Sequence, residues 1–329
     1  MMSMRKSILS GMGLWLALAG VAFGYDPLAV DTNVPPQTLE LTVHDATRDR
    51  DIPVKVYLPA VTSAAPVVLF SHGLGGTREG SMFLGVHWAE RGYVAVFLQH
   101  PGSDDSVWKG KNMLDGMTSM DGAASLKNFE LRVKDVPAVL DQLAVWNGDA
   151  TSPLAGRMNL TKVGMSGHSF GAVTTEAVSG EAFLGGRQAF TDKRITAAIA
   201  FSPSSPKAAR PAVAFGSVKI PWMLMTGTKD TSPIGNQDVA SRLAVYDNLV
   251  APEKYELVLN NAEHSVFTDR ALPGDKEPRN PNHHRVILAL STAFWDAYLK
   301  DDPAAAAWLN SQTPRGVMEA EDGWKFEGK

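Results

Sequence analysis

The stretch that decides the fold is Val163–Gly171, which reads VGMSGHSFG and leads into the helix-like run Ala172–Val178. It carries Gly167, Ser169 and Gly171 in the pattern G-x-S-x-G, between a strand-like run and a helix. This order predicts a strained turn that holds the Ser169 hydroxyl at the edge of a sheet as a nucleophile. Side chains at positions 167 and 171 would collide with neighbouring backbone. The alternative is a glycine-rich turn with Ser169 only as a helix N-cap.

Short β-type runs alternate with longer helical ones along the rest of the chain. The expected strands are Leu39–Val43, Ile52–Leu58, Val67–Ser71, Tyr93–Leu98, Ile195–Phe201, Trp222–Met225 and Tyr255–Leu259, and the expected helices are Phe83–Arg91, Phe129–Leu143 and Val286–Leu299. Pro137 predicts a break or restart of the middle helix near Asp135. The alternation predicts an α/β fold, with a mainly parallel central sheet, helices on both faces and an antiparallel N-terminal edge.

A glycine-rich loop, His72–Gly76, follows the early strand Val67–Ser71. Such a loop can present a backbone N–H to a developing oxyanion. We predict the N–H of Leu74 for this role, together with that of Phe170, the residue after the nucleophile. His72 itself is expected to hydrogen-bond locally and not to act as a base. The alternative is a flexible glycine turn.

The general base is sought among the histidines that follow Ser169, because a serine hydroxyl needs an imidazole to accept its proton. In this arrangement the chain order is serine, acid, histidine, which leaves His264, His283 and His284. His264 lies in a polar loop directly after the strand Tyr255–Leu259, whereas the other two lie at the start of the closing helix. We therefore predict His264 as the base.

Asp230 is the predicted acid, because it follows the buried strand Trp222–Met225 and precedes a turn. Its role would be to hold the Nδ1–H tautomer of His264 and to stabilise the imidazolium. Glu263 and Asp192 are the alternatives. The first is too close in sequence to His264 to point easily at its ring, and the second lies in a loop before a strand.

Four segments resemble a known group of proteins. Leu69–Gly75 (LFSHGLG) and Gly167–Gly171 (GHSFG) are similar to the platelet-activating factor acetylhydrolase group and to bacterial proteins described as predicted dienelactone hydrolases. Asp51–Pro59 (DIPVKVYLP) and Gln99–Asp104 (QHPGSD) fit the bacterial branch. The resemblance runs loosely over most of the chain. It implies an α/β-hydrolase fold, a Ser–Asp–His triad and no cofactor.

The chain departs from that group at the acid. In the mammalian acetylhydrolases the acid follows the earlier strand, where this chain has only Ser202–Ser205. Asp230 instead looks like the arrangement in cutinase-like polyester hydrolases. True dienelactone hydrolases use a cysteine nucleophile, and this chain has no cysteine. The dienelactone name is therefore a poor guide to the substrate.

Composition excludes several other classes of protein. The chain has 329 residues, of which 44% are hydrophobic and 20% charged, so it can bury a real core and is not disordered. Its formal net charge of −4 argues against a nucleic-acid partner. We find no metal-ligand spacing, Walker loop or dinucleotide fingerprint, so neither a metal nor a cofactor is expected. His100 and Asp104, which lie at a strand end, are expected to fix a loop.

The first 24 residues are predicted to be a secretory signal peptide. Arg5 and Lys6 precede the apolar run Ile8–Phe23, which at 16 residues is short for a membrane span and ends in a small-x-small site. The alternative is an uncleaved membrane anchor. We therefore expect an exported protein, in the periplasm or the medium, with a single domain over residues 25–329 and no later membrane span.

Two insert loops, residues 104–127 and 203–221, are expected beside the site. Side chains of the first insert could line an apolar pocket or lid, or pack as a satellite core: Trp108, Met113, Met117 and Met120. The expected function is an exported serine carboxylic-ester hydrolase that acts on a small-molecule, lipid or polymeric ester through an acyl-enzyme. The alternatives are a serine peptidase or amidase on the same fold, and a non-catalytic binding protein on a hydrolase scaffold.

Overall fold

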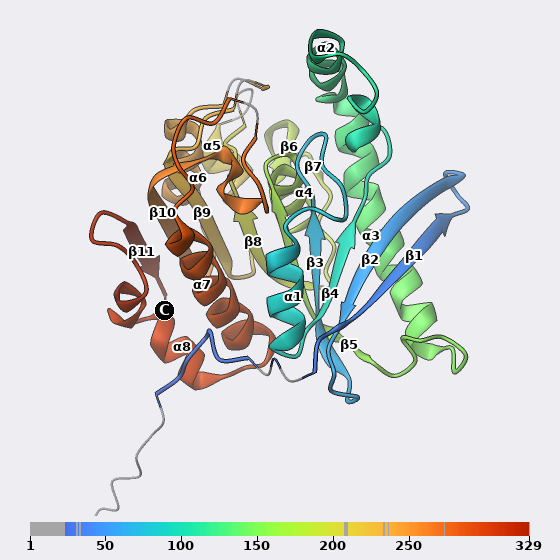
Figure 1. Cartoon of the computed structure of the whole chain (residues 1–329), viewed down its shortest axis with the longest axis horizontal. Helices are drawn as coiled ribbons and strands as arrows, with labels where there is room; N and C mark the ends of the chain where they lie inside the picture. The colour runs from blue at the N-terminus through green and yellow to red at the C-terminus, as the bar shows by residue number, and fades with distance from the viewer. Residues whose placement is uncertain are drawn as a thin grey trace, which may run out of the picture.

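The computed structural model describes residues 24–328, apart from residues 31, 33, 207–209, 233, 236 and 273 (Figure 1). The predicted signal peptide lies outside the described residues except for Gly24. Within the described part, none of the helices combines the length and the apolar character that a membrane crossing requires.

One central sheet organises the described chain. Its order is β1 (Gln37–Asp45), β2 (Arg50–Leu58), β4 (Val94–Leu98), β3 (Ala65–Ser71), β5 (Met158–His168), β8 (Ile195–Phe201), β9 (Trp222–Lys229), β10 (Lys254–Glu263) and β11 (Gly323–Glu327). The six strands from β4 to β10 run parallel, whereas β1 and β2 form an antiparallel edge. The predicted fold class is therefore confirmed. The opposite edge, antiparallel β11, was not predicted, because only Trp324 of this short strand is buried.

Helices cover both faces of the sheet (Figure 1). One face packs against α1 (Met82–Glu90), α7 (Pro281–Leu299) and α8 (Pro303–Leu309). The other packs against α3 (Leu126–Gly148), α4 (Phe170–Val178) and α6 (Val239–Asn248). The smaller elements are α2 (Met113–Ala123), α5 (Pro211–Ala214), β6 (Ala182–Phe183), β7 (Gln188–Ala189), and the 3-10 helices η1 (Asp105–Val107), η2 (Leu184–Gly186), η3 (His264–Phe267) and η4 (Thr313–Gly316).

The break expected near Asp135 is wrong, because α3 continues through Pro137 without interruption. An interior proline costs a helix about 3 kcal/mol. Burial of one large apolar side chain stabilises by about 1.5–3 kcal/mol. Packing against the sheet outweighs the proline, since α3 buries six such side chains: Phe129, Val133, Val136, Val139, Leu140 and Leu143.

The two expected insert loops are partly helical. The first contains η1, α2 and the first residues of α3, and the second contains α5. The Asn112 side chain caps α2 by accepting a hydrogen bond from the N–H of Asp115. Figure 1 shows α2 projecting beyond the carboxyl ends of the parallel strands. The first insert is therefore a structured rim at the edge where ligands of such sheets bind.

Candidate active site

Ser169 lies in the turn between β5 and α4, with φ 57° and ψ −115°. Positive φ is strained for a residue with a side chain, at a cost of about 1–3 kcal/mol. The surrounding backbone holds it there. A Cβ on Gly167 would lie 2.3 Å from the carbonyl oxygen of Gly171, and one on Gly171 would lie 1.9 Å from that of Ser71. Only glycine fits at both positions, so the turn is locked against the end of β3.

The structure brings Ser169, Asp230 and His264 together from the ends of three strands. The Oγ of Ser169 lies 2.9 Å from Nε2 of His264. Nδ1 of His264 lies 2.7 Å from Oδ1 of Asp230. The His264 side chain is 14% exposed and that of Asp230 is fully buried. The three groups form one hydrogen-bonded chain that reaches the surface at the serine.

Polar groups surround the buried carboxylate of Asp230. Ser202 and Thr226 donate hydroxyl hydrogen bonds to its Oδ2, at 2.6 and 2.8 Å, and Arg242 Nε lies 2.9 Å from its Oδ1. Burial alone would raise the pKa of Asp230. The hydrogen bond and charge of His264, followed by Arg242, outweigh burial and hold that pKa well below its usual range. The ionised Asp230 therefore presents an acceptor to Nδ1 of His264, while Nε2 of the same ring faces Ser169 Oγ.

His168 contacts both the backbone and the ring of His264. Its Nε2–H donates to the carbonyl oxygen of His264 at 2.9 Å, and the two ring centroids lie 4.6 Å apart. Burial, followed by the charge of His264, lowers the pKa of His168 well below its usual value, so this ring is neutral. Gly227 lets β9 and β10 approach each other, since a Cβ there would lie 2.1 Å from the carbonyl oxygen of Ala262. Sequence reasoning identified neither residue.

The loop after β3 lies against Ser169. An added Cβ on Gly73 would lie 3.4 Å from Cβ of Ser169. The carbonyl of Gly73 accepts hydrogen bonds from Nδ1 of His72 at 2.6 Å and from the N–H of Gly76 at 3.0 Å. Within the described residues, the N–H groups of Leu74 and Phe170 have no hydrogen-bond acceptor. Both N–H groups are therefore available to a bound group.

The alternatives for the base and the acid have other partners. His283 donates to the carbonyl of Asn260, and His284 to that of Val266. The Glu263 carboxylate accepts from the N–H groups of two later residues, and Asp192 pairs with Arg194. None of these four side chains bonds to Ser169.

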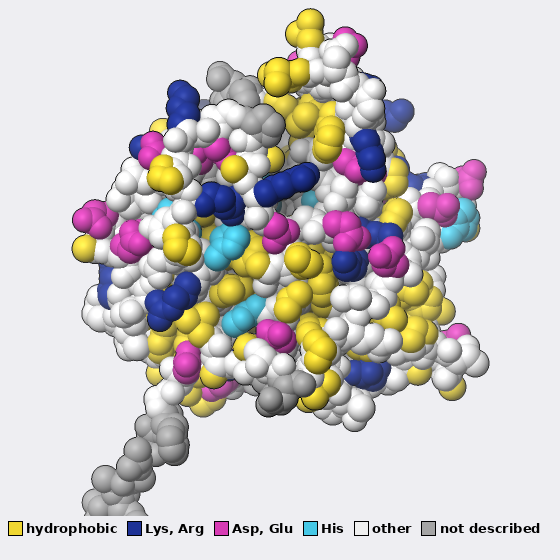
Figure 2. Space-filling model, viewed as in Figure 1, with side chains coloured by type: hydrophobic (Ala, Val, Ile, Leu, Met, Phe, Trp, Pro, Cys, Tyr) yellow, Lys and Arg dark blue, Asp and Glu magenta, His cyan; other side chains and the backbone are white. Residues whose placement is uncertain are grey.

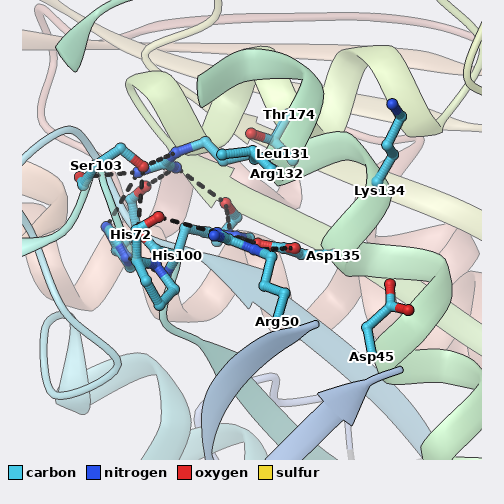
Figure 3. Close-up of polar contacts among 12 residues, drawn as sticks. Asp45, Arg50, His72, His100, Ser103, Leu131, Arg132, Lys134, Asp135 and Thr174 are labelled. Atoms are coloured by element: carbon cyan, nitrogen blue, oxygen red, sulfur yellow. Dashed lines mark hydrogen bonds and ion pairs between the residues drawn. The ribbon is translucent and has the colours of Figure 1, made fainter. Parts of the chain in front are cut away.

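His100 belongs to a buried network under the loop after β3 (Figure 3). His100 lies between Ser71 Oγ, 2.9 Å from its Nε2, and Asp135 Oδ2, 2.9 Å from its Nδ1. Asp104 accepts hydrogen bonds from Gln99 and Ser106. No cluster of three or more potential metal ligands occurs among the residues that the structure describes.

Two buried arginines, Arg132 and Arg242, were not singled out from the sequence. Arg132 lies three residues after Phe129 and one before Val133, on the apolar face of α3. Arg242 similarly precedes the buried Val245 and Tyr246 on α6. A lone charge on an apolar helical stripe is the signal that would have revealed both.

The mostly parallel sheet and the serine in its strand–turn–helix motif are those of an α/β hydrolase. The chain belongs to the PET hydrolase-like family, whose model matches residues 107–273, half of the chain. This is a family of α/β-hydrolase-type ester hydrolases. The matched segment includes Ser169, Asp230 and His264, and it ends before the closing helix. No curated protein matches the chain.

Proposed function

We propose that the chain is a serine carboxylic-ester hydrolase that works through an acyl-enzyme, with Ser169 as nucleophile, His264 as general base and Asp230 as orienting acid. The observation that carries the proposal is the hydrogen-bonded chain from Ser169 Oγ through both ring nitrogens of His264 to the ionised Asp230. A base held in one tautomer against a serine hydroxyl is the arrangement that activates this nucleophile.

In the acylation step, Oγ of Ser169 bonds to the ester carbonyl carbon as its proton passes to Nε2 of His264. The carbonyl oxygen becomes an oxyanion and accepts hydrogen bonds from the N–H groups of Leu74 and Phe170. One such donor typically lowers the barrier by about 3 kcal/mol. When the tetrahedral intermediate collapses, the ester C–O bond breaks and the leaving oxygen takes the proton from His264.

Deacylation repeats these steps with water. His264 accepts a proton from the water as its oxygen adds to the acyl carbon. Collapse then breaks the bond to Ser169 Oγ, which recovers its proton from His264, and the carboxylic acid leaves. Asp230 stays ionised throughout and stabilises the imidazolium in both halves.

The proposed substrate class is an ester with an apolar part, whether small, lipid or polymeric. The indole N–H of Trp108 donates to the carbonyl of Gly75 at 2.7 Å, which fastens the rim to the loop after β3. On α2 the side chains of Met113, Leu114 and Met117 are 79%, 74% and 54% exposed, and Figure 2 shows apolar side chains at this tip. An apolar surface beside the proposed site favours apolar esters.

Replacement of Ser169 by Ala tests the proposal. With p-nitrophenyl acetate, we expect kcat of Ser169→Ala to fall by about 10⁵–10⁶ because the nucleophile is lost. A fluorophosphonate probe should label the wild type at Ser169 and leave the variant unlabelled. The matched control is Ser166→Ala, because Ser166 lies on the same strand but bonds to the carbonyl of Leu69. Full turnover by Ser169→Ala would contradict the proposal.

Matched ester and anilide substrates separate the esterase from a peptidase or amidase. We expect the ester to be hydrolysed far faster. The resemblance to the platelet-activating factor acetylhydrolase group is tested in the same assay, with a short-acyl phospholipid as a third substrate.

We also propose export, with cleavage after Gly24 and a single mature domain over residues 25–329. The support is the charged start, short apolar middle and small-residue exit of the first 24 residues. Expression of the full chain in a bacterium, followed by fractionation and N-terminal sequencing, should give a mature protein that begins within a few residues of Tyr25. An intact N-terminus in the membrane fraction would contradict this.

A further inference from the structure

Arg132 is a fully buried arginine of α3 that reaches the loop after β3 (Figure 3). Its Nη1 donates to the carbonyl of His72 at 2.7 Å, and its Nη2 lies 3.4 Å from the carbonyl oxygen of Gly73. Its Nε donates to Ser103 Oγ at 2.8 Å, and Nη2 also donates to the Ser103 carbonyl at 3.3 Å. One guanidinium therefore joins the loop after β3 to the loop after β4.

These contacts set the direction of the Leu74 N–H. A trans peptide is planar, so the carbonyl of Gly73 and the N–H of Leu74 point in opposite directions. Nδ1 of His72 and the N–H of Gly76 donate to that carbonyl at 2.6 and 3.0 Å, and Nη2 of the buried Arg132 adds a longer contact on the same side of the loop. The N–H of Leu74 must then point away from Arg132.

Arg132 also contacts the residue that carries the second proposed donor. Its guanidinium carbon lies 4.4 Å from the ring centroid of Phe170. A guanidinium within about 6 Å of an aromatic ring centroid is attracted to the negative face of the ring. The side chain of Phe170 is thereby fixed next to Ser169. A single side chain contacts the segments that bear both N–H groups.

A buried hydrogen-bonded chain holds Arg132 in turn. Arg132 Nη1 lies 3.4 Å from Ser71 Oγ, which donates to Nε2 of His100, and Nδ1–H of His100 donates to Asp135. Burial, followed by the charge of Arg132, lowers the pKa of His100 to about 4, so the ring is neutral and this proton order holds. Asp135 is also bonded by Nε and Nη2 of Arg50. The network leaves Arg132 little freedom to reorient.

We infer that Arg132 is a positioning residue, which orients the backbone N–H groups of Leu74 and Phe170 toward the oxyanion of the reaction. The inference rests on the proposed function. It assigns Arg132 no contact with the substrate, so its removal should weaken transition-state stabilisation and leave ground-state binding nearly unchanged.

The test compares Arg132→Gln with the wild type, using p-nitrophenyl acetate. Prolonged fluorophosphonate labelling first counts the folded active sites in each sample. Per labelled site, we expect kcat to fall about 100- to 1000-fold, the effect of losing an oxyanion donor, with KM within threefold. An aryl trifluoromethyl ketone forms an oxyanion on addition of Ser169, so its inhibition constant should rise with the loss in kcat/KM.

Arg157→Gln is the matched control. Arg157 also donates to two loop carbonyls, those of Pro59 and Val61, each at 2.7 Å, but in a loop that leads into the opposite end of β3. We expect its kcat per labelled site to stay within twofold of the wild type. Should Arg132→Gln fail to fold, Arg132→Lys takes its place. The three N–H donors of an ammonium share one nitrogen and cannot reproduce the planar fork in which Nη1 bonds the His72 carbonyl and Nε bonds Ser103. We therefore expect kcat at least tenfold below the wild type.

The outcomes separate the two proposals. Wild-type protein that neither hydrolyses the ester nor reacts with the probe would overturn the proposed function. Active wild type with unchanged kcat per site in the folded Arg132 variant would overturn only the positioning role. In that case Arg132 would contribute to stability alone.

Discussion

The molecule contains two hydrogen-bonded Ser–His–Asp triplets of nearly the same geometry, here called Ser–His–Asp chains. In Ser169–His264–Asp230 the two hydrogen bonds measure 2.9 and 2.7 Å, and in Ser71–His100–Asp135 both measure 2.9 Å. Ser71, His100 and Asp135 are fully buried, whereas Ser169 is half-buried and His264 is 14% exposed. Ser71 lies within a strand, but Ser169 lies in a strained turn at a helix start. The distances among three side chains therefore do not by themselves define an active site. What distinguishes the two is solvent access to Ser169 and His264, together with the N–H groups of Leu74 and Phe170 near Ser169.

The two serines provide the largest expected difference. Ser169→Ala should lose essentially all turnover, as proposed above. Ser71→Ala should reduce kcat less than tenfold, because the Ser71 hydroxyl, among the described residues, bonds only to His100 and to the edge of the Arg132 guanidinium. It should lower the unfolding free energy by about 1 kcal/mol through the lost hydrogen bond. Urea unfolding and esterase assays on the two variants check this. A loss of activity in Ser71→Ala as large as that of Ser169→Ala would break the comparison.

Substitution of the two acids should affect different properties, turnover for Asp230 and stability for Asp135. Asp230→Asn should lower kcat by about 10⁴, because the amide can no longer hold the Nδ1–H tautomer of His264. Asp135→Asn should instead lower the unfolding free energy by about 3–5 kcal/mol, since Arg50 loses a buried ionic partner. Denaturant melts and kcat per labelled site measure the two effects. A stable but inactive Asp135→Asn would show that Asp135 matters for turnover and not only for stability.

A pair of buried glutamates contrasts with both of these aspartates. Glu176 and Glu181 are buried, and each has a carboxylate oxygen without a hydrogen-bond partner among the described residues. Burial raises the pKa of Glu181 to about 8, and burial together with the charge of Glu181 raises that of Glu176.

The raised pKa values give a pH dependence of stability with a definite sign. The folded state binds more protons than the unfolded state between the ordinary glutamate pKa and about 8, so the unfolding free energy falls as pH rises through that window. Glu181→Gln should remove on the order of 2 kcal/mol of that fall. Chemical denaturation at pH 5 and pH 8 checks it, with exposed Glu130→Gln as the control. An equal fall in both variants would contradict the pKa assignment.

His168→Phe is expected to have a smaller effect than the substitutions of Asp230, Asp135 or Glu181. His168→Phe keeps a ring against His264 but removes the donor to its carbonyl. We expect kcat to fall about tenfold, equivalent to about 1.4 kcal/mol, with KM unchanged. Steady-state kinetics on ester substrates measure it. A variant with wild-type kcat would show that Asp230 alone orients the base.

Local sequence patterns predicted much of the architecture. The G-x-S-x-G motif between a strand and a helix placed the turn of Ser169, and apolar runs identified the parallel strands. Chain order selected Asp230 and His264, and the structure places His264 within hydrogen-bond distance of both Asp230 and Ser169. These signals are local, or follow from the order in which parallel strands end at one edge.

Other features depend on contacts that sequence patterns do not record. The helix α2 leaves its large apolar side chains unburied and contains Gly116 and Gly122, so its pattern resembles a loop. Burial of Arg132 and Arg242 depends on which carbonyls lie opposite them in the folded chain. The continuity of α3 through Pro137 was likewise decided by tertiary packing. Each failure is a case in which packing outweighed a local preference.

The lock between Gly171 and the carbonyl of Ser71 also matters for protein engineering. No atom can be inserted at that contact, so the turn of Ser169 and the end of β3 behave as one part. A transplant of the serine motif into another scaffold would have to bring the neighbouring strand terminus with it. Directed-evolution libraries built on this chain should hold both segments constant and diversify the α2 rim instead.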